Sequence, residues 1–88
     1  MIGFDKGSEM NIQVQLGAKI RDLRTKRGLS QEKLADACGL HRSRMGEIER
    51  GRANVTLSTL QAIAHKLQTT PAALLLEEIA PVVGKQSA

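Results

Sequence analysis

The sequence is poor in the residues that mark several protein classes. It has one cysteine in 88 residues, no tryptophan, no tyrosine and a single phenylalanine, Phe4. One cysteine cannot form an internal disulfide, which excludes a small secreted protein held together by disulfides. Proteins that bind single-stranded nucleic acid by base stacking need exposed aromatic side chains, and this chain offers almost none.

Long apolar runs are missing as well. The longest runs, such as Ala72 to Leu76, are far shorter than the roughly 20 residues that a helix needs to cross a bilayer. The first six residues lack the basic start and apolar stretch of a secretory signal. We therefore expect a cytoplasmic protein with no membrane partner.

Nothing in the sequence indicates catalytic or metal chemistry. His41 and His65 are far apart, and Cys38 has no metal-ligand spacing with either of them. Glu77 and Glu78 are adjacent, so their side chains diverge on a helix and cannot act as a catalytic pair. We expect no enzymatic activity, no metal, no cofactor and no small-molecule ligand, with Cys38 packed as a small apolar residue.

Positive charge is concentrated in the middle of the chain. The net charge is +4, and the segment from Leu16 to Arg52 holds ten basic and five acidic residues against three basic and four acidic residues elsewhere. Such a concentration indicates either a solvated basic face or a binding site for a polyanion such as nucleic acid.

Apolar residues recur at intervals of three and four, which predicts an all-α domain of five short helices. The first helix carries an apolar stripe and ends at Gly28, where glycine suits the left-handed position after a helix. The expected elements are a helix with the stripe Leu16, Ile20 and Leu23; Gln31–Cys38 after the N-cap Ser30 and before Gly39; His41–Arg50 before Gly51; a helix that buries Leu57, Leu60, Ile63, Ala64 and Leu67; and a helix from Pro71 to about Ile79.

Capping residues indicate where three of these helices begin. We expect His41 to cap the third helix. Ser58 and Gln61 match a capping box, which predicts the start of the fourth helix. Thr70 followed by Pro71 is typical of the start of a helix, and begins the fifth.

The ends of the chain are expected to lie outside this domain. Apolar residues alternate with polar ones from Met10 to Leu16, a strand-like period that indicates an extended arm or a lead-in to the first helix. We predict a flexible N-terminal arm over residues 1–13, the folded domain over residues 14–81, and a tail over residues 82–88.

The fifth helix and the residues after it have more apolar surface than one buried stripe requires. A helix that is apolar on two faces is usually buried on both, which indicates contact with a second copy of the chain. The alternative is that one or two leucines are simply exposed. The residues expected at a dimer interface are Leu75, Leu76, Ile79, Val82 and Val83.

The second and third helices, joined by Gly39 and Leu40, match the helix-turn-helix unit. Here the sequence resembles the phage-repressor-type (Cro-type, or XRE) helix-turn-helix regulators, over Leu16 to about Leu76. The matching residues are Leu23-Arg24, Gly28-Leu29-Ser30-Gln31, Leu34-Ala35, Gly39-Leu40, Arg42-Ser43, Ile48-Glu49-Arg50-Gly51-Arg52, Asn54, Leu57, Leu60 and Ile63-Ala64. The stretch Gly46 to Gly51 with Asn54-Val55 is also similar to the controller proteins of restriction–modification systems.

This resemblance implies a compact five-helix, lambda-repressor-like fold that binds double-stranded DNA as a homodimer. It implies transcriptional regulation from a palindromic operator, with the protein at the nucleoid when bound. An alternative is an antitoxin-like interaction module that neutralises a partner protein and also regulates its own operon.

The third helix is the expected recognition helix, because the major groove of B-DNA admits one α-helix. Arg42, Gly46 and Arg50 are four residues apart and share a face, with Ser43 and Glu47 beside it. The residues expected to contact bases are Arg42, Ser43, Gly46 and Glu47, and those expected to contact phosphate are Gln31, Arg44, Arg50, Arg52 and Asn54. Simple solvation of these side chains is the alternative.

Individual roles follow from chemistry. The Arg42 guanidinium can bond guanine at two places at once. Gly46 permits close approach to the groove, or merely weakens the helix. Glu47 can accept from the amino group of cytosine, or it can hold an arginine such as Arg44. The family pattern also implies a partly buried ion pair between Arg24 and Glu49 that ties the first helix to the third.

Overall fold

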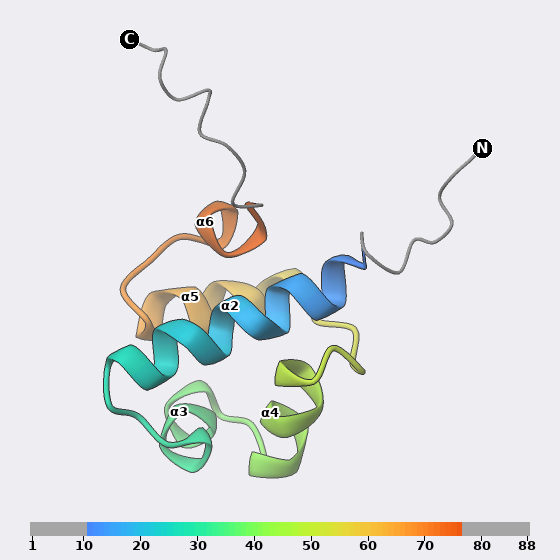
Figure 1. Cartoon of the computed structure of the whole chain (residues 1–88). Helices are drawn as coiled ribbons and strands as arrows, with labels where there is room; N and C mark the ends of the chain where they lie inside the picture. The colour runs from blue at the N-terminus through green and yellow to red at the C-terminus, as the bar shows by residue number, and fades with distance from the viewer. Residues whose placement is uncertain (1–10, 77–88) are drawn as a thin grey trace, which may run out of the picture.

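The computed structural model describes residues 11–76, which form five helices and, within that range, no strand (Figure 1). The all-α prediction is thereby confirmed. The helices are α2 (Ile12–Lys26), α3 (Gln31–Cys38), α4 (Arg42–Glu49), α5 (Leu57–Lys66) and α6 (Pro71–Leu75). Among these residues, no helix combines the length and apolar character needed to span a membrane.

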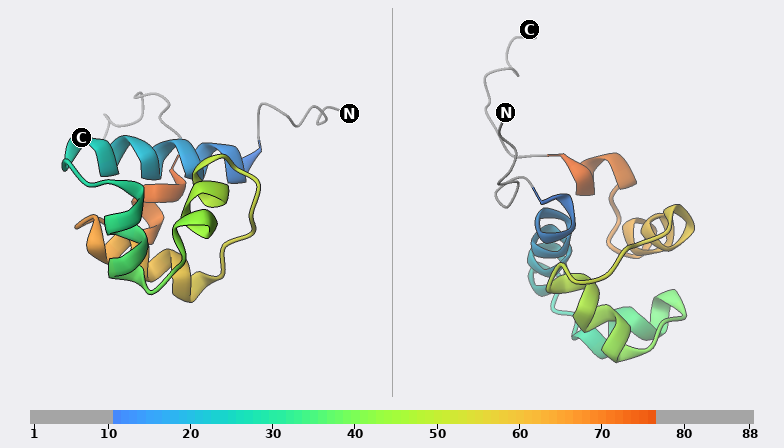
Figure 2. Two further views of the ribbon diagram at one scale, coloured as in Figure 1. Left: turned by 90° about the horizontal axis from the view of Figure 1, so that it is seen from below. Right: turned by 90° about the vertical axis from the view of Figure 1, so that its right-hand side faces the viewer.

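The helices pack as a closed ring around one core. The main contacts run from α2 to α4, from α4 to α3, from α3 to α5, from α5 to α6 and from α6 back to α2. Figures 1 and 2 show the long helix α2 along one side, with α3 and α4 at one end of the molecule and α6 at the other.

The core is made of apolar side chains from all five helices and from two residues outside them, Ala53 and Leu67. Burying them supplies the main driving force for folding, about 1.5–3 kcal/mol for each large side chain. The buried apolar residues are Leu16, Ile20, Leu34, Ala35, Met45, Ile48, Ala53, Leu60, Ile63, Ala64, Leu67 and Leu74.

Local capping follows the sequence closely at two helices. The Ser30 hydroxyl accepts from the backbone N–H of Lys33 at 3.0 Å and begins α3. The Thr70 hydroxyl does the same for Ala73 at 3.0 Å and begins α6. Gly39 ends α3 with φ of 72°, a left-handed conformation in which glycine carries no steric penalty.

The N-terminal arm is shorter than expected, because α2 begins at Ile12. The Asn11 side chain caps this helix by accepting from the backbone N–H groups of Gln13 and Val14. The prediction that residues 11–13 belong to an arm is therefore wrong. The other alternative for this alternating pattern, a lead-in to the first helix, agrees with the structure, and Ile12 and Val14 lie on the exposed side of α2.

The start of α5 also differs from the expectation. Thr56, two residues before Ser58, is the N-cap, and its hydroxyl accepts from the backbone N–H of Thr59 at 3.1 Å. The capping box of Ser58 and Gln61 is therefore wrong. Leu57 is the first residue of α5, beyond the edge of the core, and it is 81% exposed instead of buried.

Helix α6 ends earlier than the sequence suggested. Leu76 has ψ of 135°, an extended conformation, so the helix stops at Leu75 instead of continuing to about Ile79. Leu75 and Leu76 are exposed, as the dimer hypothesis requires. The other three expected interface residues, Ile79, Val82 and Val83, lie outside the described residues.

Two glycines allow α2 to approach α4 closely. A Cβ atom on Gly17 would lie 2.4 Å from the carbonyl oxygen of Ile48 and 2.5 Å from that of Glu49. A Cβ atom on Gly51 would lie 2.7 Å from Val14 Cγ2, and Gly51 has φ of 77°. Only glycine fits at these contacts, which fix the C-terminal end of α4 against α2.

Candidate nucleic-acid interface

Helices α3 and α4 form a compact two-helix unit with a tight turn. Gly39 takes the left-handed conformation, and the backbone N–H of Leu40 donates to the carbonyl oxygen of Ala35 at 2.8 Å. The Leu40 side chain packs against the core from the turn. Two short helices held in this way have the geometry of a helix-turn-helix unit.

Helix α4 is fixed in rotation about its axis by its buried side. Met45 and Ile48 are fully buried, and Glu49 is buried between helices. Arg42 and Ser43 lie on the exposed side at the start of the helix. We call the surface formed by Arg42, Ser43, Gly46, Glu47 and Arg50 the recognition face.

The buried side of α4 is tied to α2 and α3 by one carboxylate. Arg24 Nε donates to Glu49 Oε2 at 2.6 Å, and Arg24 Nη2 donates to Glu49 Oε1 at 3.0 Å. Arg24 also donates to the carbonyl oxygen of Leu29 at 2.7 Å. Gln31 Nε2 donates to Glu49 Oε1 at 3.0 Å, which links the first residue of α3 to the same pair.

The structure thus brings Arg24 and Glu49 together, and adds a third member that the sequence did not indicate. Gln31 was expected to contact phosphate, yet its amide nitrogen is engaged with Glu49. Its amide oxygen lies near Gly46, at the edge of the recognition face. The Arg24–Glu49 pair therefore fixes the orientation of the Gln31 side chain that would contact DNA.

The recognition face is hollowed at its centre. The hollow is lined by residues from the start of α3 and along α4: Gln31, Arg42, Ser43, Gly46 and Arg50. Gly46 itself is buried, because the Arg50 guanidinium lies over it. The missing side chain of Gly46 makes room for Arg50, and the expected role of Gly46 at a base stays a prediction.

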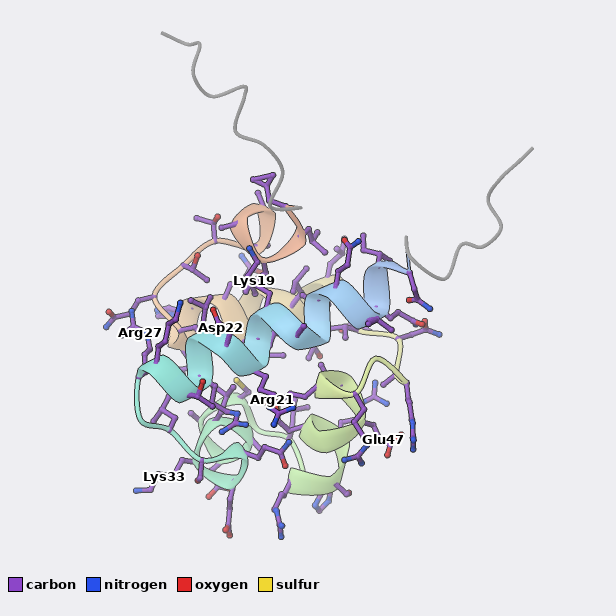
Figure 3. All side chains as sticks on the ribbon, viewed as in Figure 1. Lys19, Arg21, Asp22, Arg27, Lys33 and Glu47 are labelled. Carbon is purple, nitrogen blue, oxygen red and sulfur yellow. The ribbon has the colours of Figure 1, made fainter. Side chains whose placement is uncertain are left out.

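Glu47 binds Arg50 and not Arg44. Arg50 Nη2 donates to Glu47 Oε2 at 2.9 Å, and Figure 3 shows Glu47 projecting outward from α4. The hydrogen bond from Arg50 is the main cause that lowers the pKa of Glu47, and the nearby charges of Arg50 and Arg52 add to it. The carboxylate is therefore ionised at neutral pH.

Arg44 and Asn54 are brought together by another contact. Arg44 Nη2 donates to the carbonyl oxygen of Asn54 at 3.0 Å. The Asn54 side chain accepts from the Gln13 side-chain amide, which ties the loop after α4 to the first turn of α2. Arg52 is exposed in the same loop. Arg44, Arg52 and Asn54, all expected to contact phosphate, thus lie along this loop and the adjoining side of α4.

Several structural residues escaped the sequence analysis. Gly17 interrupts an otherwise ordinary helical pattern, and that isolated glycine was the available signal for a close helix crossing. Gln13 gave no signal, because its partner lies 41 residues away.

Two residues that the sequence analysis did name have structural places. His41 is the N-cap residue of α4, but its side chain makes no capping hydrogen bond. Cys38 is half-buried against the core, and that burial raises the pKa of its thiol.

Comparison with known proteins agrees with this geometry. A family model described as helix-turn-helix matches residues 20–74. The chain is 44% identical to the control protein C.BamHI of Bacillus amyloliquefaciens over 66 residues, which cover 74% of this chain and 82% of that protein. The chain belongs to the helix-turn-helix family of transcriptional regulators.

Solved structures support the same assignment. The restriction–modification controller protein C.AhdI from Aeromonas hydrophila matches with a TM-score of 0.68 and 45% identity, covering 70% of this chain and 94% of that chain. The regulator of biofilm formation SinR, solved in complex with DNA, matches with a TM-score of 0.66 and 27% identity, covering 69% and 98%. The resemblance to phage-repressor-type regulators is thus confirmed for this helix-turn-helix protein.

Residues 11–76 of the helix-turn-helix protein contain no cluster of three or more histidine, cysteine or carboxylate side chains suited to a metal ion. The candidate site among these residues is the recognition face, which has arginines at both ends and a hollow between them.

Proposed function

We propose that this protein binds a palindromic operator in double-stranded DNA as a homodimer, and that α4 enters the major groove. The observation that carries this proposal is the rotation of α4, which buries Met45 and Ile48 while it exposes Arg42 and Ser43. A helix that presents arginine at its exposed N-terminal turn is suited to hydrogen bonding with base edges. Arg42 is the residue we assign to a guanine.

Phosphate contacts come from the flanks of α4. Arg44 and Arg52 are exposed beside the recognition face, and Gln31 lies at the first turn of α3, where backbone N–H groups also favour an anion. Phosphate contacts fix the orientation of the protein on the duplex and carry no base information directly. We assign Gln31, Arg44, Arg52 and Asn54 to this role.

A second copy of the chain has an apolar surface available to it. Ile12, Leu57 and Leu75 are 55%, 81% and 38% exposed and line one groove together with Val55. Exposed leucines clustered in this way favour an interface over isolated exposure. We therefore place the dimer contact on this groove instead of on the C-terminal helix alone.

The similarity to C.BamHI and C.AhdI supports the role of a control protein for this chain. In a two-fold dimer the recognition helices meet half-sites whose centres are about 34–36 Å apart, one turn of the double helix. A bound operator should therefore show two half-sites with that spacing.

The test is selection of bound duplexes from a random pool with the purified protein, followed by affinity measurements at several salt concentrations. We expect a palindromic site and an affinity that falls steeply as salt rises, because phosphate contacts release counterions. Arg42→Ala should abolish the preference at one base pair in each half-site. Lys66→Ala, on α5, removes the same charge away from α4 and should leave that preference intact.

Two results would contradict the proposal. One is the absence of any preferred sequence at physiological salt. The other is a sequence preference that survives Arg42→Ala unchanged, because α4 would then not be the element that contacts the bases.

A further inference from the structure

Glu47 and Arg50 form an ion pair on the recognition face itself. Arg50 Nη2 lies 2.9 Å from Glu47 Oε2, and the two side chains are 53% and 42% exposed. The Arg50 guanidinium also lies over Gly46, where a Cβ atom would be 3.4 Å from Nη2 and 3.5 Å from Nη1. Position 46 has no side chain, so the guanidinium lies in the central hollow.

Glu47 is the carboxylate of α4 that is available to DNA. The other carboxylate of this helix, Glu49, is buried and accepts from Arg24 and Gln31. A carboxylate placed in the major groove is repelled by phosphate and by most base acceptors unless a cation compensates it. Arg50 supplies that compensation, so Glu47 and Arg50 should enter the groove together.

The pair presents hydrogen-bond donors beside acceptors. A guanidinium has five N–H donors in a planar fork, and a carboxylate has about four acceptor positions. One contact between Glu47 and Arg50 leaves donors on Arg50 and acceptor positions on Glu47. The pair therefore presents two adjacent N–H donors of Arg50 next to a carboxylate oxygen acceptor of Glu47.

That order of groups matches one kind of base pair. In the major groove, a G·C pair presents the two adjacent acceptors N7 and O6 of guanine, followed by the N4 donor of cytosine. An A·T pair separates its two acceptors, N7 and O4, by the N6 donor. Two adjacent donors followed by an acceptor therefore fit G·C better than A·T.

We propose that Glu47 and Arg50 act as one specificity-determining unit that recognises a G·C pair in each half-site. Arg50 donates to guanine, and Glu47 accepts from the paired cytosine while it holds Arg50 over Gly46. This assignment moves Arg50 from phosphate contact to base contact. It rests on the proposed DNA-binding function, and it adds a second recognised base pair to the one assigned to Arg42.

The two recognised base pairs are different ones. Arg42 and Arg50 are eight residues apart, which corresponds to about 12 Å along a helix. Neighbouring base pairs are separated by about 3.4 Å along a DNA strand. We therefore assign the two arginines to different base pairs.

The experiment is quantitative selection of bound duplexes with the wild-type protein and with Glu47→Gln and Arg50→Lys. Glu47→Gln removes the charge and keeps the shape, and Arg50→Lys keeps the charge and removes the fork. The matched control is Asp22→Asn, which breaks a comparable exposed pair with Lys26 (3.1 Å) on α2, away from Glu47 (Figure 3). In a second step, 7-deazaguanine replaces guanine at the identified position and removes the N7 acceptor.

We expect both variants to reduce the preference for G·C at one position of each half-site by about tenfold, while the other positions keep their preferences. Asp22→Asn should preserve every position. 7-Deazaguanine should weaken binding of the wild-type protein much more than binding of Arg50→Lys.

Three results would overturn this assignment while duplex binding itself stands. They are an unchanged preference at every position with Glu47→Gln, a uniform loss of affinity without a positional effect in either variant, and a preference for A·T at the affected position. A wild-type protein that selects no duplex would overturn both this assignment and the proposed function.

Discussion

Arg24 on α2 and Glu49 on α4 form a buried ion pair, with Nε and Oε2 2.6 Å apart and side chains only 11% and 3% exposed. The pair joins the helix that spans the domain to the helix that we assign to the major groove. Because Gln31 also donates to Glu49, this carboxylate sets the position of α4 relative to both of its neighbours.

Removal of the carboxylate should destabilise the fold. In Glu49→Ala the Arg24 guanidinium keeps its bond to the carbonyl oxygen of Leu29 but loses its buried counter-charge. We expect the free energy of unfolding to fall by about 3–5 kcal/mol, the usual cost of breaking a buried pair from one side. Thermal melting followed by circular dichroism measures this.

The control for this substitution is the exposed pair on α2. Asp22→Asn breaks the Asp22–Lys26 contact, whose side chains are more than half exposed, and should change stability by less than about 1 kcal/mol. Equal melting temperatures for Glu49→Ala and the wild-type protein would show that the pair does not support the fold.

The crossing of α2 and α4 gives a second prediction, on Gly17. In Gly17→Ala the new methyl group meets backbone carbonyl oxygens at 2.4 and 2.5 Å, and backbone cannot rotate away as a side chain can. We expect a loss of about 1–3 kcal/mol or more, as for other overpacked sites, measured by urea denaturation.

Gly46→Ala is the matched comparison for that substitution. It places the same methyl group in a helix, 3.4 Å from the movable Arg50 guanidinium. Alanine favours helix by about 1 kcal/mol over glycine, so this variant should be as stable as the wild-type protein or slightly more so. If Gly17→Ala proved equally harmless, the close approach of the two helices would be refuted.

The short-range features of this protein were open to prediction from sequence. Ser30, Gly39 and Thr70 act within three or four residues of themselves, so their composition and spacing were enough to place α3 and the start of α6. The exposed side of α4 followed in the same way from the helical period around Met45 and Ile48.

Long-range features were not open to prediction by that reasoning. The bond from Gln13 to Asn54 spans 41 residues, and the contact of Gly17 with α4 depends on how two helices cross. The choice of Arg50 over Arg44 as the partner of Glu47 depends on rotamers that spacing alone leaves open, since both arginines are three residues from Glu47. The sequence did not distinguish Thr56 from Ser58 as the N-cap of α5, because both carry a suitable hydroxyl.

A third prediction separates two glycines that share a left-handed conformation. Gly28 has φ of 71° with nothing within 4 Å of an added Cβ, whereas Gly51 has φ of 77° and would place its Cβ 2.8 Å from Val14 Cα. Gly28→Ala should cost about 1–2 kcal/mol from backbone conformation alone. Gly51→Ala should cost clearly more, because the overlap with α2 adds to the same backbone term.

Chemical denaturation of both variants checks this difference directly. Equal losses for Gly28→Ala and Gly51→Ala would mean that α2 does not press on Gly51. A loss only at Gly51 would mean that the turn after α2 accommodates alanine without strain.

The last prediction concerns the apolar groove that we assign to a second copy. Leu57 is 81% exposed, so Leu57→Glu removes no core contact. An acidic residue in the first turn of a helix also interacts favourably with the helix dipole, so α5 should remain intact. We expect sedimentation equilibrium to show a weakened dimer, while the circular dichroism spectrum and the monomer fold persist.

Ser58→Glu is the matched control, since it adds the same charge to an exposed neighbour in the same turn of α5. It should leave the dimer in place if contact is made by the leucine side chain and not by the charge of that turn. On DNA, Leu57→Glu should bind isolated half-sites as well as the wild-type protein does but lose the affinity gained from two half-sites on one duplex. A dimer of unchanged strength in Leu57→Glu would move the interface away from this groove and leave its exposed leucines without a partner.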